Sequence, residues 1–120
     1  MKKIFAFIFG LTMLCSVANA GDIYDETFDS IYEAQKVYYD LDRELGRVYR
    51  ELRRYLDYRG REVLKASEKA WISRRDHRCA FPETHSVNIE CAIRETRNRL
   101  FFLRERLQEC RSYACRIELF

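Results

Sequence analysis

Apolar residues recur at steps of three and four along two long stretches of this 120-residue chain. The first stretch lies between residues 28 and 55 and misses one step at Gln35. Its apolar members are Phe28, Ile31, Tyr38, Leu41, Leu45, Val48, Leu52 and Tyr55. The members of the second stretch are Ile89, Ile93, Thr96, Leu100, Leu103, Leu107 and Cys110. This spacing aligns apolar side chains along one face of an α-helix, so the sequence predicts two long amphipathic helices.

A further helix is predicted between these two, from about Arg61 to Cys79. Its inward face is expected to carry Leu64, Ser67, Ala70 or Trp71, and Arg75 or Arg78. We expect the first helix to stop near Tyr58, with Gly60 as its left-handed cap residue. Phe81-Pro82 should end the middle helix, because proline cannot supply the next helical hydrogen bond. Residues 80–87 are then a loop.

Three helices joined by short links favour antiparallel neighbours. We therefore expect an all-α fold, a small antiparallel three-helix arrangement with a long first helix. A single domain of this length buries a modest core, so cross-links would add useful stability. The apolar stripes are interpreted as core and not as a cofactor site, and no cofactor is expected.

The first 20 residues differ in kind from the rest. Lys2 and Lys3 precede an almost unbroken apolar run over residues 4–14, and Ala18-Asn19-Ala20 has the small-x-small form of a cleavage site. We predict a Sec-type signal peptide over residues 1–20, cleaved after Ala20. The apolar run is too short to span a bilayer. The domain over residues 21–120 is expected to be periplasmic or secreted, without membrane insertion.

Cys15 offers a competing interpretation, a lipoprotein acylated at that cysteine. The preceding Thr12-Met13-Leu14 lacks the small residue that a lipobox places before its cysteine, so cleavage after Ala20 is favoured. Cleavage leaves four cysteines, 20 basic and 19 acidic residues. A formal charge of +1 carries little information about partners.

The four remaining cysteines favour two disulfides, because their number is even and an exported chain meets an oxidising compartment. These cysteines are Cys79, Cys91, Cys110 and Cys115. Zinc is the competing interpretation. The cysteines contain no close CxxC pair, and His77 and His85 do not fall at zinc-finger spacing, so no metal is expected.

Four cysteines allow three connectivities, and the helix layout distinguishes them. Cys79 ends one predicted helix and Cys91 lies in the first turns of the next, so a helical hairpin brings them together. Cys110 lies about 28 Å further up the last helix at roughly 1.5 Å per residue. We therefore predict bonds between Cys79 and Cys91 and between Cys110 and Cys115.

Acidic and basic residues are unevenly distributed. Residues 21–42 hold seven acids and one base, whereas residues 43–120 hold 19 bases and 12 acids. Acids near a helix N-terminus complement the helix dipole, and the two regions can attract each other within the fold. Alternatively, the acidic segment faces a cationic partner. Nucleic acid is a weaker candidate, because the arginines of the later helices are interleaved with acids.

Tyrosines accompany this acidic segment. They are Tyr24, Tyr32, Tyr39 and Tyr49. Beside the first stripe, an aromatic ring can pack against the core while its hydroxyl stays in water. The alternative is that these tyrosines form a binding face.

Trp71, Arg75 and Cys79 are spaced four residues apart, with Asp76 beside Arg75. This spacing puts the first three on one helix face, where Arg75 can lie against the Trp71 indole while pairing with a carboxylate. Further characteristic positions are Asp42-Arg43-Glu44-Leu45, Val48-Tyr49, Cys91, Thr96, Arg97 and Leu100. Together these residues resemble the LprI-like lysozyme-inhibitor family, N-terminal-domain type, over residues 28–107.

The chain departs from that family pattern at two points. Gly46 follows the Glu-Leu pair where members tend to have Asn, and no cysteine occurs early in the first helix. The pair of Cys110 and Cys115 is a candidate replacement for the missing bond. The resemblance implies an exported, all-helical bacterial domain that binds a protein, with c-type lysozyme as the candidate partner.

We expect a binding protein and not an enzyme. Asp76, His77 and His85 are the candidate catalytic groups nearest one another, and no serine lies in a nucleophile elbow. Lysozyme's active site is a cleft with two carboxylates, so an inhibitor can plug it with a protruding donor. The alternative function is an envelope-stress or assembly module that binds another periplasmic protein. The sequence does not indicate an oligomeric state.

Two surfaces are candidates for the inhibitory contact. In the loop, Pro82 adds stiffness, Phe81 can pack against a cleft wall, and His85 can donate hydrogen bonds to paired carboxylates. The alternative is an ordinary connection in which Ser86 caps the third helix. The second surface is the acidic start of the first helix, which would attract a cationic lysozyme over a longer range. Its candidate residues are Asp25, Glu26 and Asp29.

Trp71, Arg75 and Asp76 are assigned to the scaffold, since their helix face is expected to point inward. Any loss of activity on replacing Trp71 should then follow from loss of folding.

Overall fold

The computed structural model describes residues 20–84 and 86–120, with side chains from residue 29 onward. Three helices, α1 (Ala20–Arg53), α2 (Tyr58–Cys79) and α3 (Ile89–Ser112), precede a short 3-10 helix, η1 (Ile117–Leu119). Within these ranges an isolated bridge is present and no strand, so the predicted all-α class is confirmed. Residues 1–19, with most of the predicted signal peptide and Cys15, and His85 lie outside the described residues.

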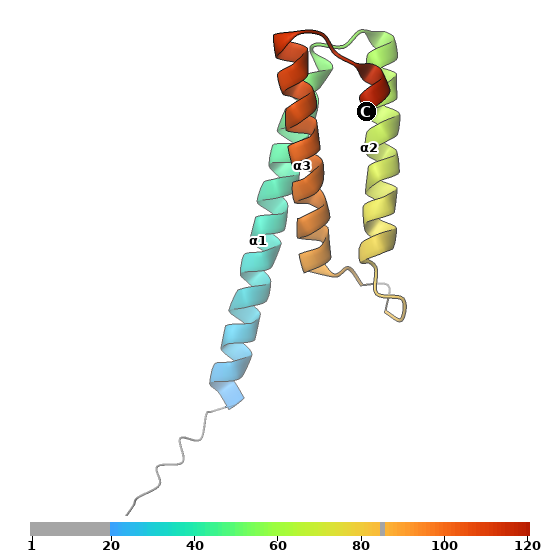
Figure 1. The fold of residues 1–120 in the computed structure, drawn as a ribbon. Coiled ribbons are helices and arrows are strands. Elements are labelled where there is room, and N and C mark those ends of the chain that lie inside the picture. Colours follow the sequence, from blue (N-terminus) through green and yellow to red (C-terminus); the bar gives the residue numbers. More distant parts are fainter. Residues whose placement is uncertain (1–19, 85) are drawn as a thin grey trace, which may run out of the picture.

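The helices run up, down and up, with α2 antiparallel to both of its partners (Figure 1). Ion pairs fix the register between the parallel helices α1 and α3. Glu44 pairs with Arg104 at 3.2 Å and Glu51 pairs with Arg111, each across 60 positions. A residue of α1 therefore lies level with the α3 residue 60 positions later. Both α1 and α2 pack mainly on α3.

The core fills the space between the three helices and consists mostly of leucine. Its buried members are Leu45, Val48, Leu52, Leu56, Leu64, Trp71, Leu100, Leu103 and Leu107. Burying one such side chain contributes about 1.5–3 kcal/mol. The predicted apolar stripes therefore do form the core over the middle of the bundle. No described helix is apolar over a length that would cross a membrane.

Gly60 does not cap α1, contrary to prediction. The helix ends at Arg53, and Gly60 lies in the first turn of α2, where its N–H donates to Asp57 Oδ1 at 2.8 Å. A Cβ at this buried position would lie 3.1 Å from the Leu56 side chain and 3.2 Å from Ile117 Cγ2. Close packing, and not a left-handed backbone, requires this glycine.

Tyr55 and Ile31 of the predicted first stripe are not core, and the Phe28 side chain lies outside the described ones. Tyr55 follows the end of α1 and is exposed, and Leu56 takes the buried position beside it. Ile31 is 50% exposed, because α1 diverges from α3 toward its N-terminal end (Figure 1). Helical periodicity shows which side chains share a face, but not where a partner helix stops covering that face.

The ends of the second and third helices agree with the predicted loop over residues 80–87. Ser86, the cap of α3 in the alternative interpretation of the loop, does not cap this helix. Asn88 is the N-cap, and its side chain accepts from the Cys91 N–H at 3.1 Å. Ser86 lies two residues earlier, and its hydroxyl contacts that of Thr84.

Two disulfides lie at the ends of the bundle. Cys79 is bonded to Cys91 with a Cα–Cα distance of 5.4 Å, and Cys110 to Cys115 with 4.4 Å. These are the pairs that the helix layout predicts. The first joins the end of α2 to the start of α3. The second folds the C-terminal segment back, so that Ile117 and other residues of that segment pack against the core.

Candidate functional site

Residues 80–87 form a stapled loop between α2 and α3. The disulfide between Cys79 and Cys91 closes its base. The Asn88 N–H donates to the Cys79 carbonyl, and the Phe81 N–H donates to the Ser86 carbonyl, both at 2.8 Å. The loop therefore has a short, hydrogen-bonded stem above a covalent base.

The described part of the stapled loop is open to solvent. Phe81 is 46% exposed, although its ring is large and apolar. Together with Pro82, Glu83 and Thr84 it lines a shallow depression of about 330 Å³. A protruding loop that is already ordered loses little conformational entropy when it binds a concave partner. His85, the predicted hydrogen-bond donor, lies outside the described residues.

Trp71 and Arg75 point inward from α2, as predicted. Trp71 is 8% exposed, and the Arg75 guanidinium lies 4.9 Å from its ring centroid. Arg75 Nε donates to Asp76 at 3.0 Å. The Asp76 side chain is itself 56% exposed, so its predicted inward orientation is wrong. Adjacent helical residues point in different directions, and Asp76 reaches Arg75 from the solvent side.

Arginine and aromatic side chains alternate across the three helices. In order, this arginine–aromatic series is Tyr38, Arg75, Trp71, Arg99, Phe102 and Arg106. The distances from guanidinium to ring centroid range from 4.9 to 5.8 Å. Such contacts are worth about 0.5–2 kcal/mol each, depending on desolvation. The series therefore belongs to the scaffold that positions the stapled loop.

The phenol of Tyr38, at the α1 end of this series, is partly buried. Burial raises its pKa, while the nearby Arg75 guanidinium acts in the opposite direction. Tyr38 therefore stays neutral at ordinary pH and packs as an aromatic residue.

A buried ion pair between Arg99 and Glu68 was missed by the sequence analysis. Arg99 Nε donates to Glu68 at 2.9 Å, and Nη2 donates to Ser67 Oγ at 3.0 Å. The helical spacing does indicate that Arg99 lies near the core, because it follows Thr96 by three residues and precedes Leu103 by four. Both of those neighbours are buried, so Arg99 lies beside the core stripe.

The described start of α1 carries uncovered apolar and acidic side chains together. We name Asp29 and residues 31–39 the free segment. Tyr32 is 64% exposed, and Val37 and Tyr39 are also exposed. Among the described residues no cation lies within ion-pair distance of Asp29 or Glu33.

The described basic side chains therefore do not neutralise Asp29 or Glu33. Asp40, just beyond the free segment, pairs with Arg43 of the same helix at 2.6 Å. Asp25 and Glu26 belong to α1, but their side chains lie outside the described ones.

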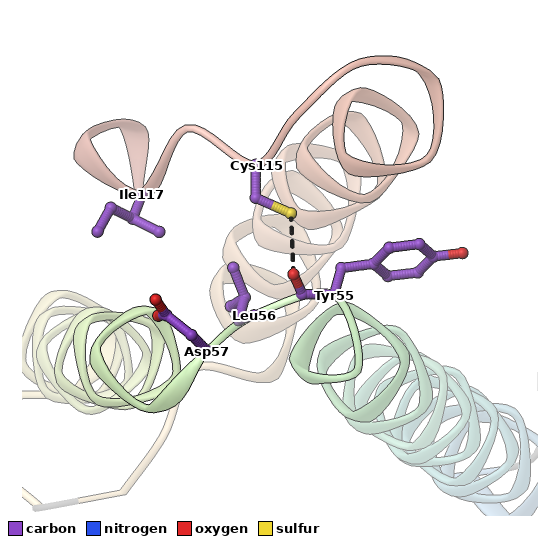
Figure 2. Close-up of a pocket in the computed structure, with 5 residues that line it drawn as sticks. All are labelled: Tyr55, Leu56, Asp57, Cys115 and Ile117. Atoms are coloured by element: carbon purple, nitrogen blue, oxygen red, sulfur yellow. Dashed lines mark hydrogen bonds between the residues drawn. The ribbon is translucent and has the colours of Figure 1, made fainter.

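A depression of about 340 Å³ lies where the C-terminal segment crosses the link between α1 and α2 (Figure 2). Cys115 Sγ approaches the Tyr55 carbonyl oxygen to 3.6 Å, and as a disulfide sulfur it has no proton to donate. Asp57, the one ionisable carboxylate of this depression, is already the N-cap of α2. The depression offers no converging chemical groups.

Of the three residues considered for catalysis, the structure describes Asp76 and His77. Asp76 and His77 are exposed on α2, and His85 is not among the described residues. Within the described ranges, no three potential metal ligands are grouped.

Comparison with known proteins gives one family. A family model with the description lysozyme inhibitor LprI matches residues 20–103. The match includes α1, α2, the stapled loop and most of α3, and it ends before Cys110. Neither the curated proteins nor the solved structures include a match to this chain.

Proposed function

Because this chain belongs to the LprI lysozyme-inhibitor family, we propose that it binds a lysozyme and blocks the active-site cleft. The stapled loop is the observation that carries the proposal. It is exposed, closed by a disulfide and held by two backbone hydrogen bonds. Inhibition by occupancy requires no catalytic group of the inhibitor.

The chemistry of the loop suits a cleft that contains two carboxylates. One carboxyl group of such a cleft acts as a general acid in an apolar surrounding, and the other is ionised. In our proposal Phe81 packs against the apolar wall, and His85 donates hydrogen bonds to a carboxylate. Pro82 and the disulfide reduce the entropy that binding would otherwise cost.

We also infer that the chain is exported and cleaved after Ala20. The basic start, the apolar run and the small-x-small ending support a signal peptide over residues 1–20. Two disulfides within one small domain also favour an oxidising compartment. The proposed location is the periplasm or the extracellular medium.

A module that binds a different periplasmic protein, in envelope stress or assembly, is the second candidate function. The exposed aromatic rings of Tyr32 and Tyr39 favour it, because such rings contribute strongly to protein interfaces. This function would not depend on the stapled loop.

The test uses purified residues 21–120 and a panel of lysozymes acting on cell walls. We expect near-stoichiometric inhibition of at least one c-type lysozyme. Phe81→Ala should abolish most of the inhibition. Tyr113→Ala is the matched control, because Tyr113 is a highly exposed aromatic residue beyond the opposite end of α3. Absence of inhibition across the panel would favour the second candidate function.

A further inference from the structure

The free segment of α1 and the stapled loop lie at the same end of the bundle. Two ion pairs and the approach of Cys115 to Tyr55 all join residues 60 positions apart. At this offset Asp29 lies level with Ile89, the first residue of α3, which follows the loop directly. Figure 1 shows α1 extending past the bundle at the end where the loop lies.

The apolar seam of α1 continues into the free segment and loses its cover there toward the N-terminal end. Its positions alternate by three and four residues and are 31, 34, 38, 41, 45, 48 and 52. Leu45, Val48 and Leu52 are buried. Ala34 and Tyr38 are partly buried, and Ile31 is half exposed. The exposed part begins where α1 diverges from α3. A helix face with the spacing of a core seam, left open at one end, is suited to contact another molecule.

Charge identifies the kind of molecule. The free segment carries Asp29 and Glu33 with no ion-pair partner among the described residues, and Lys36 is its one base. A second copy docked through the same segment would bring like charges together, which costs several kcal/mol in an interface. A cationic surface is instead complementary, so the occupant that this segment favours is a lysozyme of net positive charge.

We propose that the free segment and the stapled loop bind the same cationic lysozyme molecule at the same time. This inference rests on the proposed function, since it takes the inhibited enzyme as the occupant. A globular protein of 100 residues has a radius of gyration of about 13 Å and therefore spans more than roughly 26 Å. One such protein is therefore wide enough to touch both surfaces. The loop fills the cleft, while the free segment attracts and orients the enzyme.

The experiment measures lysozyme binding by chains altered at each surface, over a range of salt concentrations. Asp29→Asn combined with Glu33→Gln should raise Kd about tenfold at low salt and flatten the salt dependence of the association rate. Glu105→Gln combined with Glu118→Gln changes the net charge equally, at exposed acids away from the free segment, and should leave Kd unchanged.

The contribution of exposed aromatic side chains to lysozyme binding has its own test. Tyr32→Ala should weaken binding several-fold, and adding Phe81→Ala should weaken it further. Tyr113→Ala serves again as control. Sedimentation should give a complex of one chain and one lysozyme, and circular dichroism should show that every variant keeps its helices.

The outcomes separate the two proposals. Suppose that Phe81→Ala removes inhibition while the Asp29 and Glu33 variant binds like the unaltered chain. Binding through two surfaces is then wrong, and inhibition by the loop stands. Binding through two surfaces is also wrong if the control pair weakens lysozyme binding equally, or if one chain binds two lysozymes. An unaltered chain that binds no lysozyme overturns both.

Discussion

Arg99 of α3 donates a 2.9 Å hydrogen bond to Glu68 of α2 in the interior of the bundle. Arg99 is 7% exposed, and its guanidinium also contacts Ser67 and the rings of Trp71 and Phe102. Few other polar contacts join these two helices. Removing one member of a buried pair leaves the other charge unpaired and desolvated.

Arg99→Met should therefore lower the free energy of unfolding by about 3 kcal/mol. Arg78→Met is the control, because Arg78 pairs with Glu95 across the same two helices but is largely exposed. That pair is worth at most about 1 kcal/mol. Urea denaturation followed by circular dichroism distinguishes them. Equal destabilisation by both variants would show that burial of the Arg99 pair has no special effect.

Trp71→Ala should cost about 3–5 kcal/mol of stability, because it removes a large buried ring and two arginine contacts. Tyr58→Ala, at a highly exposed aromatic position of the same helix, should stay within about 0.5 kcal/mol of the unaltered chain. Thermal melting and lysozyme binding are measured together. A Trp71→Ala chain with an unchanged Tm that no longer binds would place Trp71 in the contact surface.

Alanine should have opposite effects at two glycines. Gly60→Ala introduces a Cβ 3.1 Å from Leu56 and 3.2 Å from Ile117, and we expect a loss of about 1–2 kcal/mol. At Gly46, within α1, the nearest atom is Nη1 of Arg50 at 3.3 Å, the end of a flexible side chain. Gly46→Ala should stabilise by up to about 1 kcal/mol, since alanine favours helix. Denaturant midpoints show whether each variant is more or less stable than the unaltered chain.

The two disulfides should differ in their effect on function. Replacing Cys79 and Cys91 with alanine should cost about 3 kcal/mol and weaken inhibition further, because the stapled loop loses its covalent base. Replacing Cys110 and Cys115 should cost about 2 kcal/mol, since the closed loop is shorter, and should leave inhibition intact at temperatures where the chain is folded. Full inhibition by the first variant would contradict a preordered loop.

The carboxyl group of Glu44 should make stability depend on pH. Its hydrogen bond with Arg47 is the main cause that lowers its pKa from 4.5 to about 2, and Arg104 adds to the effect. A lowered pKa stabilises the fold above the unfolded value of 4.5, and this contribution is lost as pH falls toward 2. Denaturation between pH 5 and 2 should show a shallower decline for Glu44→Gln. The difference should shrink at high salt.

The helices and their cysteine pairs follow from the sequence alone. Steps of three and four align Leu45, Val48 and Leu52 on one face of any α-helix. The hydrophobic effect favours burial of that face. Pro82 ends a helix through its own covalent structure. The predicted cysteine pairs depend on helix length, which rises by about 1.5 Å per residue.

The remaining features were decided by the tertiary structure, because they depend on which atoms meet from distant parts of the chain. Gly60 is constrained by Ile117, 57 positions away, and no local rule contains that contact. Arg99 is charged, and its burial depends on Glu68 lying opposite on another helix. Ile31 has the spacing of a core residue, yet it stays exposed because α1 diverges from α3. Periodicity defines a face of a helix, whereas only packing determines what covers it.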